Sequence, residues 1–127
     1  MFCGIDRFKA VNDTYGHAAG DAVLKEIANR LTAAVRSHDL VARIGGDGFI
    51  VVLVNELVAA DATRIAEKIR AAVTEDLRIG THHVAITMSI GVAASATNTI
   101  TELIADADEA LLRAKAGGRD QIATFGA

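Results

Sequence analysis

A glycine-rich turn between two apolar stretches sets strong limits on the fold of this chain. Residues Leu40 to Ile44 are short and β-prone, and Phe49 to Val54 form a continuous apolar run of strand length. The turn Gly45-Gly46-Asp47-Gly48 permits positive φ angles and a close approach of the backbone to a ligand. This region is therefore predicted to be a β-hairpin with the carboxylate of Asp47 at its tip. Such a turn holds a phosphate or a metal, or it is an ordinary hairpin turn with a solvated aspartate.

Helical periodicity describes three further segments. Apolar residues recur at helical spacing from Ala22 to Arg36, and Asp21 is placed to cap or favour the start of that helix. The same spacing returns over residues 65–73 and 100–114. Amphipathic helices are predicted in all three places.

The remaining apolar segments have the character of strands. Residues 84–92 alternate with period two, which predicts a strand with one face more apolar than the other, and residues 77–79 are predicted to pair with it. The two ends of the chain, residues 1–6 and 121–125, also read as strands. The resulting order of elements predicts a layered α/β (α+β) fold, in which helices pack on a mainly antiparallel central sheet.

Composition excludes several classes of protein. The 127 residues suffice for one domain, and a net charge of −3 with scattered Lys and Arg argues against a surface that coats nucleic acid. The single cysteine, Cys3, cannot form an internal disulfide and fits a reducing compartment. No apolar run reaches the roughly 18 residues of a membrane span, and no signal-peptide pattern opens the chain. A cytoplasmic domain without membrane contact is predicted, although a membrane-tethered parent protein would leave the same trace.

The segment from Gly4 to Asp21 is dense in polar groups. Asn12 supplies an amide suited to O6 or N3 of guanine, and Asp21 supplies a carboxylate for the N1 and N2 hydrogens. Lys9 is suited to a phosphate. Taken singly, Asn12 also fits an ordinary turn and Asp21 an ordinary helix cap.

A combination of short motifs spans nearly the whole chain. They are Phe8-Lys9, Asn12-Asp13, Gly16-His17, Gly20-Asp21, Arg36, Asp39, Arg43, Gly45-Gly46-Asp47, Ser89-Ile90-Gly91-Val92, Ala107-Asp108, Ala114-Lys115 and Gly118-Arg119. This pattern resembles the GGDEF family, the diguanylate cyclases of bacterial cyclic di-GMP signalling. The resemblance implies a fold like the palm of nucleotidyl cyclases and polymerases. It also implies a reaction in which two domains, each holding one GTP, meet in antiparallel fashion to make the cyclic dinucleotide.

The resemblance also implies a nucleotide site. In that site Asn12 and Asp21 would read guanine, the backbone near Phe8 and Lys9 would hold phosphates, and Lys115 and Arg119 would grip the terminal phosphates.

Two acidic residues of the family's metal site are missing. The first-strand motif of the family is Asp, any residue, Asp, whereas this chain has Gly4-Ile5-Asp6, and Gly48 stands where the family has Glu. Mg²⁺ is held by a few protein carboxylates plus substrate oxygens, which leaves Asp47, the Ile5 carbonyl and Asp6 as ligands. Even outer changes at metal sites cost roughly 10- to 100-fold. A weakened or absent Mg²⁺ site with little turnover is predicted, and weak activity through Asp6 and Asp47 stays open.

Two further features bear on regulation. The family usually has a helical segment before the first strand, so residues 1–127 are predicted to be a single domain without that segment. Arg36 and Asp39 keep the spacing of the family's inhibitory site for cyclic di-GMP, to which Lys68 would add a basic group. The simpler explanation is a helix end that favours Arg36 and a solvated Asp39.

Three functions follow from these residues. The first is a degenerate GGDEF domain that binds GTP, cyclic di-GMP or both, and regulates an attached or partner sensory or phosphodiesterase module. The second is a diguanylate cyclase with low residual activity. The third is a structural or dimerisation module without a ligand, which the joint presence of the base-reading side chains disfavours.

Overall fold

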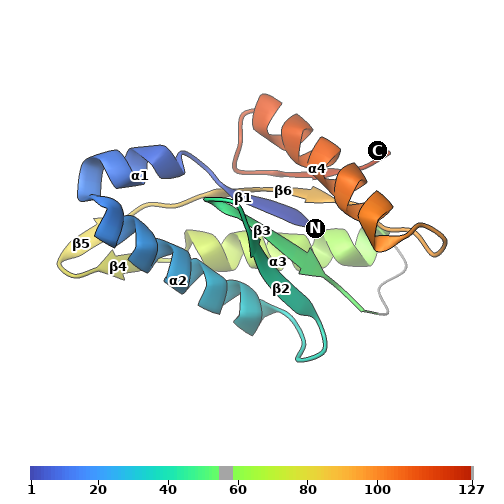
Figure 1. The fold of residues 1–127 in the computed structure, drawn as a ribbon, viewed down its shortest axis with the longest axis horizontal. Coiled ribbons are helices and arrows are strands. Elements are labelled where there is room, and N and C mark those ends of the chain that lie inside the picture. Colours follow the sequence, from blue (N-terminus) through green and yellow to red (C-terminus); the bar gives the residue numbers. More distant parts are fainter. Residues whose placement is uncertain (55–58, 127) are drawn as a thin grey trace.

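The computed structural model describes residues 1–54 and 59–126, and it consists of one mixed sheet with helices on both faces (Figure 1). The last residues of the predicted hairpin strand border the gap, and Val54 lies in a turn. The elements are β1 (Phe2–Ile5), α1 (Phe8–Tyr15), α2 (His17–Ala34), β2 (Leu40–Ile44), β3 (Gly48–Val52), α3 (Ala59–Thr74), β4 (Leu77–Ile79), β5 (His82–Val84), β6 (Met88–Val92), α4 (Ile100–Ala116) and β7 (Ile122–Thr124).

The main sheet has five strands in the order β2-β3-β1-β6-β7. Every pairing in it is antiparallel except that of β6 with β7. The predicted hairpin is present as β2 and β3, with Leu40 opposite Val52 and Ile44 opposite Gly48. The predicted class, an α/β fold with a mainly antiparallel central sheet, is confirmed.

Helices form a layer on each side of this sheet (Figure 1). Helix α4 packs on β6, β7 and β1 from one side, and α2 and α3 pack against each other and the sheet on the opposite side. The larger core lies under α2 and α3, where Cys3, Ile27 and Ile69 are fully buried. Burial raises the pKa of the Cys3 thiol to about 12, so this cysteine is a packing residue rather than a nucleophile.

The segment before α2 differs from the sequence prediction. The polar connection contains a separate helix, α1, which the sequence analysis did not predict, and α2 begins at His17 rather than near Ala22. Gly16 separates the two helices with a φ of 91°, a conformation that favours glycine. Because α2 starts earlier, Asp21 lies inside the helix, and its predicted role as a cap is wrong.

The strand predicted over residues 84–92 is divided in two. The short strand β4 pairs with β5, not with β6, through a turn in which Gly80 has a φ of 61°. The strand β6 is buried on both faces because α3 covers one side and α4 the other. The alternating pattern predicted one face more apolar than the other. In the structure both faces of β6 are buried, so the pattern does not separate a core face from a solvent face.

Helix α4 lies directly on the backbone of β6 at Gly91. A Cβ at this position would overlap with the carbonyl oxygen of Ala107 and the amide nitrogen of Leu111, both main-chain atoms of α4. Main-chain atoms of a packed helix cannot move aside individually. The packing of α4 therefore requires a residue without a side chain at position 91, and Gly91 sets how closely α4 approaches the sheet.

We predict that Gly91→Ala lowers the free energy of unfolding by about 3 kcal/mol or more, because the added methyl group pushes α4 from the sheet. The measurement is urea unfolding followed by circular dichroism. Gly4→Ala is the matched control, since a Cβ there has its nearest neighbour at an ordinary 3.5 Å. A loss for Gly91→Ala no larger than that of the control would show that α4 does not rest on Gly91.

Candidate nucleotide site

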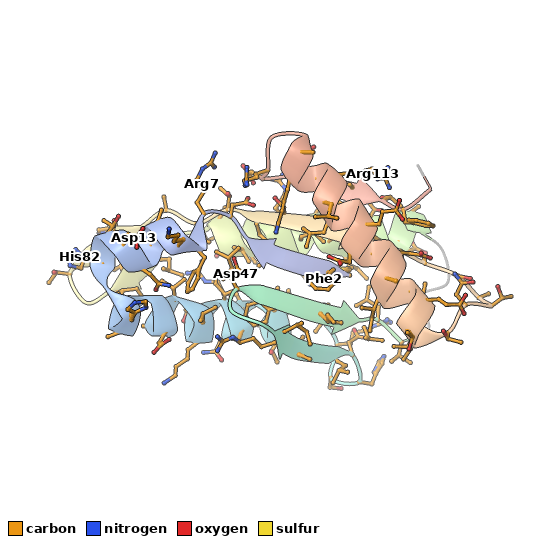
Figure 2. The ribbon with its side chains drawn as sticks, turned by 45° about the horizontal axis from the view of Figure 1, so that its top comes forward. Phe2, Arg7, Asp13, Asp47, His82 and Arg113 are labelled. Carbon is orange, nitrogen blue, oxygen red and sulfur yellow. The ribbon has the colours of Figure 1, made fainter. Side chains whose placement is uncertain are left out.

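The two positions that lack the family's acidic side chains face each other. Gly4 on β1 and Gly48 on β3 are direct partners in the antiparallel pair. Next to them, Asp47 lies at the tip of the hairpin (Figure 2), and its carbonyl oxygen accepts a 3.1 Å hydrogen bond from the Ile5 N–H. The sequence showed each loss separately, whereas the register shows that both remove charge from one small patch.

The two glycines differ in the space that is available for an added Cβ atom. A Cβ on Gly4 would lie 3.5 Å from Cε and 3.6 Å from Nζ of Lys115, which reaches over from α4. A Cβ on Gly48 would lie only 2.9 Å from the carbonyl oxygen of Ile44, a distance that requires the backbone of β2 to shift. A Cβ therefore fits at position 4 without rearrangement, whereas a Cβ at position 48 needs an adjustment of the hairpin.

Asp6, the remaining acidic residue of β1's motif, is engaged in the protein interior. It is 6% exposed, and its carboxylate accepts hydrogen bonds from the hydroxyls of Thr87 at 2.7 Å and Ser89 at 2.6 Å. The same carboxylate accepts the N–H of Asp120 at 2.9 Å. These bonds tie β1 to β6 and to the loop after α4. In this arrangement Asp6 acts as a structural link, and service as a substitute metal ligand would require breaking these bonds.

The loop after α4 carries Arg119 in an uncommon conformation. Arg119 and Asp120 have φ angles of 66° and 45°, and besides them Arg7 is the only described non-glycine residue with a positive φ, at 53°. Asp120 is held on two sides, by Asp6 through its N–H and by Arg70 on α3 through a 2.7 Å ion pair with its carboxylate. These contacts compensate for the unfavourable backbone conformation and fix the position of the loop.

Four cations stand on segments that adjoin this end of the site: the connection from β1 to α1, the first turn of α1, the last turn of α4 and the loop after α4. Within residues 1–54 and 59–126, their side chains make no hydrogen bond or ion pair with the protein. Figure 2 shows Arg7 on the segment between β1 and α1, pointing away from the sheet. The four residues are Arg7, Lys9, Lys115 and Arg119.

The predicted guanine-reading residues lie next to one another at the junction of α1 and α2. The Asn12 amide packs so closely on Gly20 that a Cβ there would overlap with Asn12 Oδ1. Asp21 follows directly and lines a groove of about 450 Å³ between α2 and the hairpin, together with Arg43 and Phe49. Arg43 also donates a 3.0 Å hydrogen bond to the Gly46 carbonyl, which holds the turn beside the groove. The volume falls within the range of small-molecule sites.

The predicted phosphate-binding residues occupy the start of α1. Phe8 is partly buried against the core, and Lys9 is exposed. The first N–H groups of a helix lack partners within the helix and suit an anion, although a direct role of Phe8 and Lys9 stays a prediction.

The turn between α2 and β2 holds Arg36 and Asp39. Asp39 accepts hydrogen bonds from the N–H of Arg36 and from the N–H of Val54, both at 2.9 Å, and its side chain is 1% exposed. It is therefore not a solvated aspartate, as the simpler explanation assumed. Lys68 is exposed on α3, and the shared inhibitory site of Arg36, Asp39 and Lys68 stays a prediction.

The structural links around Asp6 and Asp39 were missed by the sequence analysis. Thr87 and Ser89 stand at alternate positions of an otherwise apolar strand, a pattern that signals a buried polar partner on that face. No comparable signal in the sequence marks Asp120 or Arg70.

The family model described as "Diguanylate cyclase, GGDEF domain" matches residues 1–121. The chain belongs to the GGDEF family. It is 42% identical over 127 residues to the bifunctional diguanylate cyclase/cyclic di-GMP phosphodiesterase MucR of Pseudomonas aeruginosa, covering 98% of this chain and 18% of MucR. The GGDEF domain thus spans less than a fifth of that relative's length.

Solved structures of GGDEF domains have the same fold. The crystal structure of the GGDEF domain of TpbB (YfiN) from P. aeruginosa superimposes with a TM-score of 0.91 at 39% identity, covering 99% of this chain and 80% of that chain. The GGDEF domain of DgcB from Caulobacter crescentus, in complex with cyclic di-GMP, superimposes with a TM-score of 0.90 at 30% identity, covering 99% and 76%. The chain is therefore a domain of the cyclic di-GMP signalling family in both sequence and fold.

None of the helices within the described ranges combines the length and apolar character needed to cross a bilayer.

We predict that Asp6→Asn loosens the loop after α4. In the variant, one carboxylate oxygen is replaced by an NH₂ group, which cannot accept a hydrogen bond from Thr87, Ser89 or the Asp120 N–H. At least one of these buried donors is then left unsatisfied, at a cost of about 1–3 kcal/mol. Native-state hydrogen exchange should show faster exchange at the Asp120 amide. Asp13→Asn, at an exposed position of α1, is the control. Unchanged protection at Asp120 would show that Asp6 does not hold this loop.

We also predict a pH-dependent contribution of Asp39 to stability. Desolvation raises the pKa of Asp39, but backbone hydrogen bonds from Val54 and Arg36 and the charge of Arg36 outweigh it, so the pKa lies below its ordinary value of 3.8. A lowered folded-state pKa stabilises the fold above the unfolded pKa and loses that effect as the pH falls through the folded pKa.

The test compares unfolding of the native chain and Asp39→Asn by urea at pH 7 and at pH 3. The variant should be less stable at pH 7 by roughly 1–2 kcal/mol, and the difference should shrink at pH 3. Asp61→Asn, which removes the same charge from an exposed pair with Arg64, is the control. A difference that stays constant with pH would refute the assignment.

Proposed function

We propose that this GGDEF domain is degenerate: it binds GTP, cyclic di-GMP or both as a regulatory module and has little or no cyclase turnover. The observation that carries the proposal is the cross-strand pair Gly4 and Gly48, which leaves the metal position without either of its family carboxylates. Phosphoryl transfer depends on cations that neutralise the developing charge and align the reacting groups.

The donor set at this position does not fit a Mg²⁺ site of ordinary strength. Within the described ranges, no group of three or more His, Cys, Asp or Glu side chains is arranged to hold a metal ion. Asp6 is committed to Thr87, Ser89 and the Asp120 N–H. Asp47 is then the remaining carboxylate, with the Ile5 carbonyl as a further oxygen ligand, which is fewer acidic groups than the family pattern supplies.

The nucleotide-binding part of the site is better preserved. Asn12 packs on Gly20 next to Asp21, and Asp21 lines the groove. Within the described residues, the side chains of Lys115 and Arg119 make no hydrogen bond or ion pair. This combination supports binding of a guanine nucleotide without efficient chemistry. Retention of these residues also disfavours a purely structural or dimerisation module.

The comparisons support a role within a larger signalling protein. MucR carries both a cyclase and a phosphodiesterase activity by name, and the domain of DgcB was crystallised with cyclic di-GMP. We propose that the present domain works in the cytoplasm beside a sensory or phosphodiesterase module. Cyclic di-GMP bound through Arg36, Asp39 and Lys68, and a homodimer of GGDEF domains, are part of the same proposal.

We predict no cyclic di-GMP after incubation of the native chain with GTP and Mg²⁺, and product from the Gly4→Asp, Gly48→Glu double variant, detected by chromatography. With both carboxylates restored, the rate of cyclic di-GMP formation should be at least about ten times the lowest rate that the assay detects. The matched control is Gly4→Asn, Gly48→Gln, which adds the same bulk without charge.

Product from the native chain would instead identify a working cyclase that uses Asp6 and Asp47. Binding of GTP and of cyclic di-GMP is measured in parallel by isothermal titration calorimetry. Absence of heat with both nucleotides would leave the structural module as the function.

A further inference from the structure

Lys115 occupies the side of the metal position that Gly4 leaves open. Its Nζ lies 3.6 Å from the point where a Cβ of residue 4 would stand, and its Cε lies 3.5 Å from that point. The residue is half-buried, and its ammonium makes no ion pair within the described part of the chain. An ammonium that is partly withdrawn from water without a counter-charge gains from an anionic ligand.

Within the part of the chain that the structure describes, no acidic side chain on the strands next to Lys115 is its ion-pair partner. Gly48 faces Gly4 across the β1–β3 pair, and the Asp6 carboxylate is satisfied by three donors. Asp47 lies beyond them at the hairpin tip (Figure 2). The loss of the two carboxylates therefore leaves the patch under Lys115 without acidic side chains on β1 and β3 at this level.

A second cation, Arg119, stands on the loop that the Asp6 network holds. It directly precedes Asp120, whose N–H is bonded to Asp6. Arg119 has a left-handed backbone conformation, with a φ of 66°. Arginine and lysine side chains at such a position bind phosphate oxygens by charge-assisted hydrogen bonds.

Building on the proposed function, we propose that this site binds the polyphosphate of a guanine nucleotide without a divalent cation, with Lys115 beside Gly4 supplying the neutralising charge and Arg119 assisting. A divalent cation needs acidic ligands that this patch lacks, and it would be repelled by the Lys115 ammonium. The ammonium itself provides both charge and hydrogen-bond donors for the phosphate oxygens. The fold family's metal is thus dispensable for binding here.

The experiment measures GTP binding by calorimetry in EDTA and in excess Mg²⁺. The dissociation constants of the native chain should agree within about threefold. Lys115→Ala should weaken binding in EDTA by about tenfold or more, the effect of losing a charge-assisted hydrogen bond. Arg64→Ala, which removes a cation from α3 on the opposite side of the sheet, should leave binding unchanged.

A matched pair of variants tests the role of position 4. In Gly4→Asp the new carboxylate lies beside Lys115 and neutralises it, so binding in EDTA should fall by about tenfold and recover with Mg²⁺. Gly4→Asn adds the same volume without the charge and should behave as the native chain. Both side chains start from a Cβ at ordinary contact distance, so neither should impair folding.

The outcomes separate this inference from the proposed function. GTP binding by the native chain in Mg²⁺ but not in EDTA would overturn the inference and leave the regulatory function standing. Binding in EDTA that survives Lys115→Ala would overturn the role of Lys115. Absence of GTP binding in both buffers would overturn the inference together with GTP binding as a function, even if the chain bound cyclic di-GMP.

Discussion

The buried carboxylate of Asp6 is the interaction on which the candidate site depends. It receives the Ser89 and Thr87 hydroxyls and the N–H of Asp120, and so it joins the central strand β1 to β6 and to the loop that follows α4. A buried charge is tolerated only when such donors surround it. Because Arg119 directly precedes Asp120, the same bonds that satisfy Asp6 also hold the backbone from which the Arg119 side chain extends. The place of this cation is therefore tied to satisfying one charge in the interior.

The main outline of the fold could be predicted because strong periodic patterns dominate its core elements. The hairpin, the helices over the middle of α2, α3 and α4, and the terminal strands all carry apolar patterns that only one type of element satisfies. Helix α1 could not be predicted in this way, because within it only Val11 is buried and its polar surface resembles a loop. The break between β5 and β6 was missed because the alternating pattern runs without interruption from Val84, the last residue of β5, to Val92, the last residue of β6.

For the candidate site, the sequence identified residue types but not their mutual positions. The absence of acidic residues at Gly4 and Gly48 was visible from the family pattern, whereas their direct pairing depends on strand register. The approach of Lys115 to Gly4 depends on how α4 lies on the sheet, which no local pattern encodes. Asp6 and Asp39 illustrate the converse: the resemblance to the family pattern suggested ligand binding, and the structure engages both in hydrogen bonds within the protein.

The close packing of α4 on Gly91 has a consequence for affinity. A helix whose main chain rests on the main chain of a strand has little freedom to slide or tilt, so the base of the Lys115 side chain is held still before any nucleotide arrives. Binding then orders the rotamers of one side chain rather than a whole segment, and the entropic loss on association is correspondingly small. A glycine that is not itself a predicted ligand thus contributes preorganisation, and the small size of residue 91 becomes a determinant of how tightly an anion is held at residue 115.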